Sequence, residues 1–266
     1  MNKGITIWSG NQLFSKGEIT VRGFIEYAAK LGFEGIDLGY FWQDRKNEFQ
    51  ELPKWLAENR IALSGYIVGN NFGGVVGTDK EAGEIKKVFQ AIDEAKIIGA
   101  NRLRIFAGGR DGLGWEEGSK MVLDCFQRCT EYAEKQKIKL ALEDHHGLAS
   151  NSEQVLFYVK KINSPYFGVT VDIGNFLFGQ EDPIVGTRNT APYAYMVHVK
   201  DWQKLPDGKL LGATVGDGVV DVRGCLKVLK ESGYQGFLSL EYEGQEDARK
   251  GIERSLRHME KCLAEI

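Results

Sequence analysis

The feature that most constrains the fold of this chain is a regular alternation between short apolar runs and longer amphipathic stretches. The apolar runs are rich in β-branched residues, which is typical of buried strands. The amphipathic stretches carry apolar residues at helical spacing. We expect strands at Ile5–Trp8, Gly35–Leu38, Ile61–Val68, Arg102–Phe106, Ile138–Glu143, Phe167–Asp172, Tyr195–Val199 and Phe237–Glu241. We expect helices at Ile19–Leu31, Glu48–Asn59, Lys80–Ile98, Gly118–Gln136, Ser152–Ile162, Asp182–Asn189, Val222–Glu231 and Glu246–Leu263, with Pro53 in the first turn of the second one.

Strands that alternate with crossover helices predict a parallel sheet of the α/β class. Eight such units in 266 residues, without a long linker, favour a closed barrel over an open doubly wound sheet. An open sheet of that kind usually has a phosphate-binding glycine loop after its first strand. The nearest glycine-rich run, residues 70–74, follows the third strand and lacks the G-x-G-x-x-G spacing. The sequence therefore predicts a single-domain, eight-stranded (β/α)8 TIM barrel over residues 1–266.

The charge of the chain argues for a small-molecule partner. Its 34 basic and 37 acidic residues are mixed along the sequence and give a net charge of −3, so no basic stripe indicates nucleic acid. No apolar run approaches the ~18–20 residues of a membrane helix, and no secretory apolar region opens the chain. We expect a cytoplasmic protein without membrane or nucleic-acid partners. Cys125 and Cys129 lie four residues apart on a predicted helix without a nearby histidine, which favours buried apolar packing over metal binding.

Four consecutive predicted strands end in ionisable residues. The run L-A-L-E-D-H-H-G at 140–147 ends its strand with Glu143, and later strands end with Asp172, His198 and Glu241. A carboxylate at the edge of a core stays charged only where a metal or another cation meets it. Each acid alone fits a helix cap or a surface ion pair equally well, but four in succession favour a site. In a barrel, these strand ends meet at one rim.

Three carboxylates and one imidazole, without a thiolate, suit Mn²⁺, Mg²⁺, Co²⁺ or Zn²⁺ better than copper or an iron–sulfur cluster. Strand alternation places further residues on the same face as these four. His145 shares the phase of Glu143, Lys200 that of His198, and Glu243 that of Glu241. The candidate substrate contacts are His145, Lys200, Arg104, Asn175 and Trp8. For Lys200 and Arg104, an ion pair with an acidic neighbour is an equal alternative.

The motifs E-D-H-H-G, V-D-I-G-N, H-V-K-D, G-D-G-V-V-D and S-L-E-Y-E-G resemble the xylose isomerase-like TIM-barrel superfamily, in its sugar phosphate isomerase/epimerase branch. That branch contains ketose 3-epimerases, inosose isomerases and dehydratases, and hydroxypyruvate isomerases. The resemblance implies one divalent ion, most often manganese, bound by Glu143, Asp172, His198 and Glu241. It also implies that Glu143 and Glu241 act as catalytic acid and base. Two positions depart from the ketose 3-epimerases, because Asn175 and Lys204 stand where a histidine and an arginine contact the substrate.

The resemblance thus implies a metal-dependent isomerase or epimerase that acts on a ketose, keto-polyol or sugar phosphate through a metal-stabilised enediolate. An inosose-type dehydratase or a keto-glycoside lyase is an alternative on the same site, and a non-catalytic sugar-binding barrel is an alternative of another class. A DNA-repair endonuclease of the same fold is disfavoured, since it needs a three-metal cluster and the chain has four histidines in all. Apolar residues on predicted helix surfaces, such as Phe157 and Tyr158, also indicate a homo-oligomer.

Overall fold

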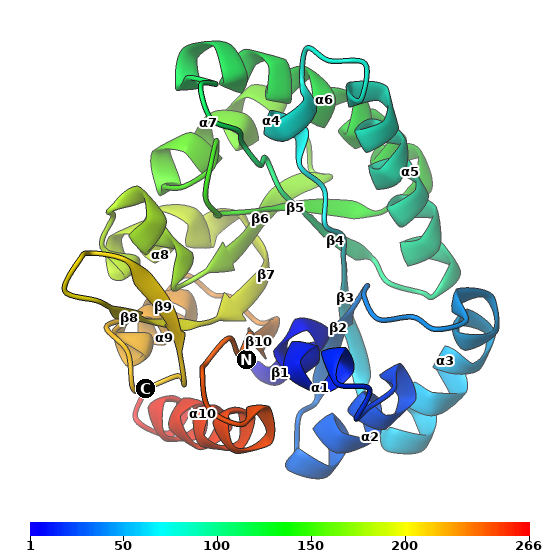
Figure 1. Cartoon of the computed structure of the whole chain (residues 1–266), viewed down its shortest axis with the longest axis vertical. Coiled ribbons are helices and arrows are strands. Elements are labelled where there is room, and N and C mark those ends of the chain that lie inside the picture. Colours follow the sequence, from blue (N-terminus) through cyan, green and yellow to red (C-terminus); the bar gives the residue numbers. More distant parts are fainter.

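The computed structural model describes residues 1–266, and its main feature is a closed barrel of eight parallel strands (Figure 1). Around the barrel the strands follow the order β1-β10-β7-β6-β5-β4-β3-β2. This confirms the predicted (β/α)8 TIM barrel. The strands are β1 (Asn2–Thr6), β2 (Gly35–Leu38), β3 (Ala62–Ile67), β4 (Arg102–Ile105), β5 (Lys139–Glu143), β6 (Phe167–Asp172), β7 (Ala194–Val199) and β10 (Phe237–Leu240).

The helices surround the barrel and cover the outer face of its strands (Figure 1). Every residue of β6 is buried, as expected for a parallel strand with core on both faces. The α-helices are α1 (Asn11–Ser15), α2 (Val21–Leu31), α3 (Arg45–Asn59), α4 (Phe72–Val75), α5 (Glu81–Ile97), α6 (Trp115–Gln136), α7 (Ser152–Ile162), α8 (Pro183–Thr190), α9 (Val222–Glu231) and α10 (Ala248–Ala264). Three short 3₁₀ helices are η1 (Ile7–Gly10), η2 (Asn175–Gly179) and η3 (Ala191–Tyr193).

The first strand begins and ends earlier than predicted. It pairs with β2 and β10 over Asn2–Thr6, and the chain then turns into η1 instead of continuing to Trp8. The hydroxyl of Ser9 explains the turn, because it donates to the carbonyl oxygen of Leu240 and accepts from the backbone N–H of Tyr242. These bonds hold η1 over the end of the barrel, where it contributes Trp8 to the site described below.

The position predicted for Pro53 was wrong. Helix α3 begins at Arg45, so Pro53 lies in its interior and not in its first turn. The earlier start has a local cause at Asp44, whose side chain accepts from the backbone N–H of Asn47. Glu48 reaches back to accept from the backbone N–H of Asp44. This reciprocal capping satisfies donors that a helix start would otherwise leave free.

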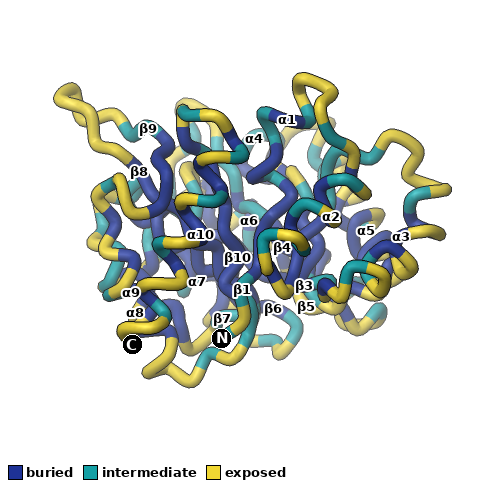
Figure 2. The backbone as a smooth tube through the Cα atoms, turned by 90° about the horizontal axis from the view of Figure 1, so that it is seen from below, coloured by how far each residue is buried: buried dark blue, intermediate teal, exposed yellow.

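Three elements are added at the end of the barrel where the strands finish. They are the antiparallel hairpin of β8 (Asp201–Lys204) and β9 (Leu210–Ala213) and the short helices α1 and α4. Figure 2 shows all three at one end of the molecule, with both chain termini at the other. The hairpin follows β7 almost directly and continues into the loop at residues 214–221. The buried carboxylate of Asp201 anchors that loop, since it accepts from the backbone N–H groups of Gly216, Gly218 and Val220, as well as from that of Trp202.

Two expectations about side-chain exposure have opposite outcomes. Tyr158 is fully buried and Phe157 is half-buried, so they are not the exposed pair that was expected. The reason is that α6 begins at Trp115, whose ring packs against both aromatic side chains. All four cysteines are buried and unpaired, which confirms the packing role expected of Cys125 and Cys129. None of the helices has the combined length and apolar character needed to cross a membrane.

Candidate metal centre and active site

The four strand-end residues converge at the carboxyl end of the barrel. Glu143 ends β5, Asp172 ends β6, His198 lies in β7 and Glu241 directly follows β10. Asp172 and His198 are aligned in neighbouring strands, which brings their side chains to the same level of the barrel. All four side chains are buried, and one potential ligand atom from each lies within 4.8 Å of those of the others.

Both ring nitrogens of His198 face carboxylates. Its Nδ1 is 3.4 Å from Oε2 of Glu143 and 3.8 Å from Oε2 of Glu241. Its Nε2 is 3.5 Å from Oδ2 of Asp37, a buried residue of β2. The other Asp37 oxygen accepts from the hydroxyl of Ser64 at 2.6 Å. A ring nitrogen that faces a carboxylate is the usual arrangement behind a metal-binding histidine, with the opposite nitrogen free for the ion.

Two buried cations lie against the glutamates. Arg104 Nε is 3.3 Å from Oε2 of Glu143, and its guanidinium lies 3.9 Å from the centre of the Phe106 ring. Lys200 Nζ is 2.6 Å from Oε2 of Glu241 and 3.5 Å from Oδ2 of Asp172. Each glutamate therefore has its own cation at close range.

These contacts determine the charge state of the two glutamates. Burial acts to raise the pKa of Glu143, but the Arg104 guanidinium and the imidazole of His198 together outweigh it and hold that pKa well below its usual range. Burial acts in the same way on Glu241, and the Lys200 ammonium lowers its pKa in turn. These lowered pKa values leave both glutamates ionised and available as bases. Burial lowers the pKa of His145 to about 3, so its imidazole is neutral at pH 7.

The unpartnered atoms of the site fit a divalent cation. Oε2 of Glu143, Oδ2 of Asp172 and Nδ1 of His198 are buried without a hydrogen-bond partner. An unsatisfied buried polar group costs about 1–3 kcal/mol, so three that converge on one point indicate a missing positive partner. The charge balance agrees with this, since the five carboxylates Asp37, Glu143, Asp144, Asp172 and Glu241 are buried around two permanent cations, Arg104 and Lys200, and around His198, whose pKa the carboxylates raise well above its usual value against the effect of burial. Oxygen and imidazole donors of this kind suit Mn²⁺, Mg²⁺, Co²⁺ or Zn²⁺.

A pocket of about 210 Å³ opens onto this cluster. It brings together most of the residues that the sequence singled out. Its lining consists of Trp8, Tyr40, Arg104, Phe106, Glu143, His145, Lys200, Glu241 and Glu243.

Asn175 does not line this pocket. It lies behind Glu143, where its side-chain amide donates to Oε1 at 3.2 Å. Lys204 is exposed at the end of β8 and is also absent from the pocket lining. The two positions that depart from the ketose 3-epimerases are thus outside the walls of the pocket.

The sequence reasoning missed Asp37, Tyr40 and Phe106. Asp37 had a detectable signal, because it is an acidic residue within the otherwise apolar strand G-I-D-L. Tyr40 and Phe106 follow β2 and β4 in the loops at the carboxyl end of the barrel, where binding residues are common. Their aromatic side chains alone did not distinguish them from core residues.

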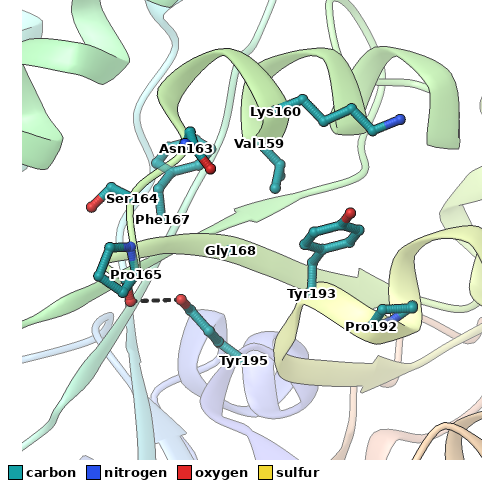
Figure 3. A pocket seen from close by; sticks show the side chains of 10 residues that line it. All are labelled: Val159, Lys160, Asn163, Ser164, Pro165, Phe167, Gly168, Pro192, Tyr193 and Tyr195. Carbon is teal, nitrogen blue, oxygen red and sulfur yellow. Dashed lines mark hydrogen bonds between the residues drawn. The ribbon is translucent and has the colours of Figure 1, made fainter.

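A cavity of about 400 Å³ lies at the opposite end of the barrel, beside the start of β6 and β7 (Figure 3). Its walls include Lys160, Tyr193 and Tyr195, and the Tyr195 hydroxyl donates to the carbonyl oxygen of Pro165. It contains no carboxylate and no imidazole. Side chains at this end of such barrels usually serve stability, and the cavity offers none of the acid–base groups found at the carboxyl end.

The sequence model of a protein family described as xylose isomerase-like TIM barrel matches residues 25–262 of the chain. The chain belongs to this family. The L-ribulose-5-phosphate 3-epimerase UlaE of Escherichia coli (strain SMS-3-5 / SECEC) is 26% identical over 233 residues, which cover 80% of this chain and 78% of UlaE.

Solved structures of other proteins share the fold at lower identity. The IolI protein with a bound zinc atom superposes with a TM-score of 0.84 at 18% identity and covers 100% of this chain and 99% of IolI. D-psicose 3-epimerase from Clostridium cellulolyticum H10 gives a TM-score of 0.77 at 14% identity and covers 99% of both chains. These likenesses establish the barrel. UlaE and the D-psicose enzyme are both named as sugar epimerases.

Proposed function

We propose that this protein is a divalent metal-dependent sugar epimerase or isomerase that acts on a ketose or a related keto-sugar. The observation that carries the proposal is the convergence of Glu143, Asp172, His198 and Glu241, with unpartnered buried atoms, on a pocket at the carboxyl end of the barrel. The epimerase names of the related proteins support the same reaction class.

In this proposal the four converging side chains hold one ion, with Mn²⁺ first and Mg²⁺, Co²⁺ or Zn²⁺ as alternatives. When bound, such an ion acts as a Lewis acid that polarises the sugar carbonyl and makes the neighbouring C–H more acidic. The carboxylate of Asp37, 3.5 Å from Nε2 of His198, faces that side of the ring and so keeps Nδ1 directed at the cluster. Asn175 donates to Oε1 of Glu143 and so fixes the orientation of that carboxylate.

Glu143 and Glu241 perform the proton transfers. They come from β5 and from the residue after β10, on different sides of the cluster, so they can flank a sugar between them. One carboxylate removes the proton from the carbon beside the carbonyl, which leaves an enediolate. The other glutamate, once it has taken up a proton from solvent, donates that proton to the opposite face of the same carbon and gives the epimer, whereas return of the abstracted proton at the adjacent carbon gives the isomer. Loss of a β-hydroxyl from the same enediolate gives the dehydrated product.

Other pocket residues contact the sugar in this proposal. Lys200 and Arg104 lie beside the glutamates and offer donors to sugar oxygens. The neutral imidazole of His145 both donates and accepts hydrogen bonds, which suits a hydroxyl group. The indole ring of Trp8 forms an apolar wall, while its N–H donates to Oε1 of Glu243 at 2.6 Å.

Deuterium exchange from D₂O into a panel of ketoses, inososes and their phosphates tests the proposal with the Mn²⁺-loaded protein. Mass spectrometry and NMR detect label at the carbon beside the carbonyl, as well as any epimer, isomer or dehydrated product. We expect exchange into at least one sugar. The variants Glu143→Gln and Glu241→Gln should retain the ion and lose turnover by at least ~10²-fold, the usual effect of removing a general acid or base.

Glu243→Gln is the matched control, because Glu243 lines the same pocket outside the four-residue cluster. Its loss of turnover should be much smaller. Absence of exchange with every sugar would support a binding barrel and end the proposal. Near-normal turnover in both metal-loaded glutamine variants would end the assigned mechanism.

A further inference from the structure

We propose that the active-site pocket continues into a second cavity that binds a neutral, hydroxyl-rich group, so that the substrate is an unphosphorylated keto-sugar joined to a second sugar unit. This inference rests on the proposed function, because it names the substrate class of the same site. The second cavity, here called the outer chamber, measures about 420 Å³. It lies between the η1–α1 segment, the β8–β9 hairpin and the residues that follow β10.

The outer chamber adjoins the pocket over the metal cluster. Trp8 and Glu243 line both cavities, and a hydrogen bond joins their side chains at 2.6 Å. The inner pocket alone, at about 210 Å³, is smaller than the ~300–1,000 Å³ typical of ligand sites. Together with the outer chamber it falls within that range. A single monosaccharide therefore leaves the larger cavity unfilled.

The hairpin forms a specific wall of this chamber. Trp202 pairs with Gly212 and Lys204 pairs with Leu210, so these four residues share one face of the hairpin. A Cβ atom at Gly212 would collide with the carbonyl oxygen of Glu243, which shows that this face packs directly against the segment after β10. Trp202 and Leu210 consequently face the chamber, while Gln203 lies on the opposite face and is not a lining residue, although its partner Leu211 is one.

The chemistry of the walls suits a sugar ring. The half-buried ring of Trp8 offers apolar surface for the C–H face of a sugar ring, and the buried aromatic residues Trp202 and Tyr242 lie in the wall beside it. The amide side chains of Gln12 and Gln245 supply both donors and acceptors for hydroxyl groups. Gln12 is already oriented, because its Nε2 donates to the carbonyl oxygen of Gly244 at 2.9 Å and leaves its amide oxygen available.

The same walls are unsuited to a phosphate. None of the 12 lining residues is Lys, Arg or His, and the only charged side chain among them is that of Glu243. In TIM barrels, the loops after the seventh and eighth strands frequently bind phosphate. Here these loops supply Trp202, Leu210 and Glu243 instead. The cations of the inner pocket, Arg104 and Lys200, lie against the glutamates there and are not part of the chamber lining.

Lys204 is the one cation that shares the chamber-facing side of the hairpin. It is exposed and is not part of the lining. A single exposed lysine is a weak anchor for a dianion compared with the paired, buried cations of dedicated phosphate sites. UlaE is named for a phosphorylated ketose, so the outer chamber is where this chain would differ from that protein in substrate class.

Calorimetry on the Mn²⁺-loaded protein tests the inference with four probes that share one ketose. The probes are fructose, fructose 6-phosphate, isomaltulose (a glucosyl group on O6 of fructose) and lactulose (a galactosyl group on O4). We expect at least one disaccharide to bind about tenfold more tightly than fructose, equivalent to about 1.4 kcal/mol. Fructose 6-phosphate should bind no more tightly than fructose, and Lys204→Ala should not change this.

Leu210→Arg places a cation in the chamber and should shift the ratio of disaccharide to phosphate affinity towards phosphate by about tenfold or more. Gln203→Arg is the matched control, since it adds the same charge on the opposite face of the same hairpin and should leave the ratio unchanged. The inference would be overturned if fructose 6-phosphate bound more tightly than both disaccharides, if all four probes bound equally, or if none of them bound. The same response to both arginine variants would also overturn it.

The outcomes for the chamber and for the proposed function are separable. A disaccharide preference without deuterium exchange would support the chamber while ending the proposed catalysis. Exchange with fructose and no disaccharide preference would support the catalysis while ending the inference about the chamber.

Discussion

Replacement of Asp37 by asparagine is the sharpest test of how the metal centre is built. Asp37 and His198 are both buried, and Oδ2 of Asp37 lies 3.5 Å from Nε2 of His198, so solvent does not weaken their interaction. Removal of a carboxylate behind a metal-binding histidine typically lowers metal affinity ~10–100-fold, or about 1.4–2.8 kcal/mol. The ion stabilises only the folded chain, so the stabilisation at saturating Mn²⁺ should fall by the same amount.

This loss has a measurable size. At ~2–4 °C of melting temperature per kcal/mol for a chain near this length, the rise in melting temperature caused by Mn²⁺ should be roughly 3–11 °C smaller in Asp37→Asn. Competition with a chelating dye gives the affinity independently. Ser64→Ala should show a smaller effect in the same direction, because its hydroxyl holds the other Asp37 oxygen at 2.6 Å. Asp93→Asn, which removes an exposed carboxylate bonded to Tyr132, is the control. Parental Mn²⁺ affinity in Asp37→Asn would refute the positioning role.

Three further predictions concern the ion, the thiols and the hairpin loop. The purified protein should hold close to one divalent ion per chain by elemental analysis, and His198→Ala or Asp172→Ala should remove most of it; full occupancy in both variants would contradict the site. Burial raises the pKa of Cys125 and of Cys225 to about 12, so a thiol reagent at pH 8 should modify less than one cysteine per folded chain and all four in urea. The pKa of a thiol in the unfolded chain is near 9, so between about pH 9 and pH 12 the unfolded chain loses thiol protons that the folded chain keeps. The free energy of unfolding should therefore fall as pH rises through that window. Asp201→Ala removes the carboxylate that accepts from four backbone N–H groups, so the free energy of unfolding in urea should fall by about 3 kcal/mol or more. An unchanged urea midpoint would show that water replaces the carboxylate.

The barrel and its four converging strand ends were predictable because both follow from local patterns. Strand and helix periods are visible within a few residues, and a parallel barrel necessarily brings the carboxyl ends of its strands to one rim. Strand alternation also placed His145 with Glu143, and both line the pocket. No geometry beyond the direction and phase of each strand was needed for these predictions.

Asp37 shows what such patterns cannot provide. It is far from His198 in the sequence and reaches it across the barrel interior, since β2 and β7 are not neighbours in the sheet. An acidic residue in an apolar strand indicates a buried partner but not its identity.

The β8–β9 hairpin was missed for another reason. Pro206, Asp207 and Gly208 give a clear turn signal, but the flanking segments are short and mix apolar with charged residues, so they resemble a loop between two barrel units.

Arg104 and Lys200 resolve an alternative that the sequence left open between an ion pair and a substrate contact. Each forms the ion pair, with Glu143 and Glu241 respectively, and each also lines the pocket. The two roles are compatible because an arginine or lysine has several N–H donors, and one carboxylate does not use them all. The arrangement has a chemical consequence. A cation at contact distance keeps each glutamate ionised and also weakens it as a base. Proton abstraction from carbon by such weakened bases requires a strongly polarised carbonyl, which the ion held by the same glutamates would supply. Base strength and metal binding at this site are therefore linked through the same two side chains.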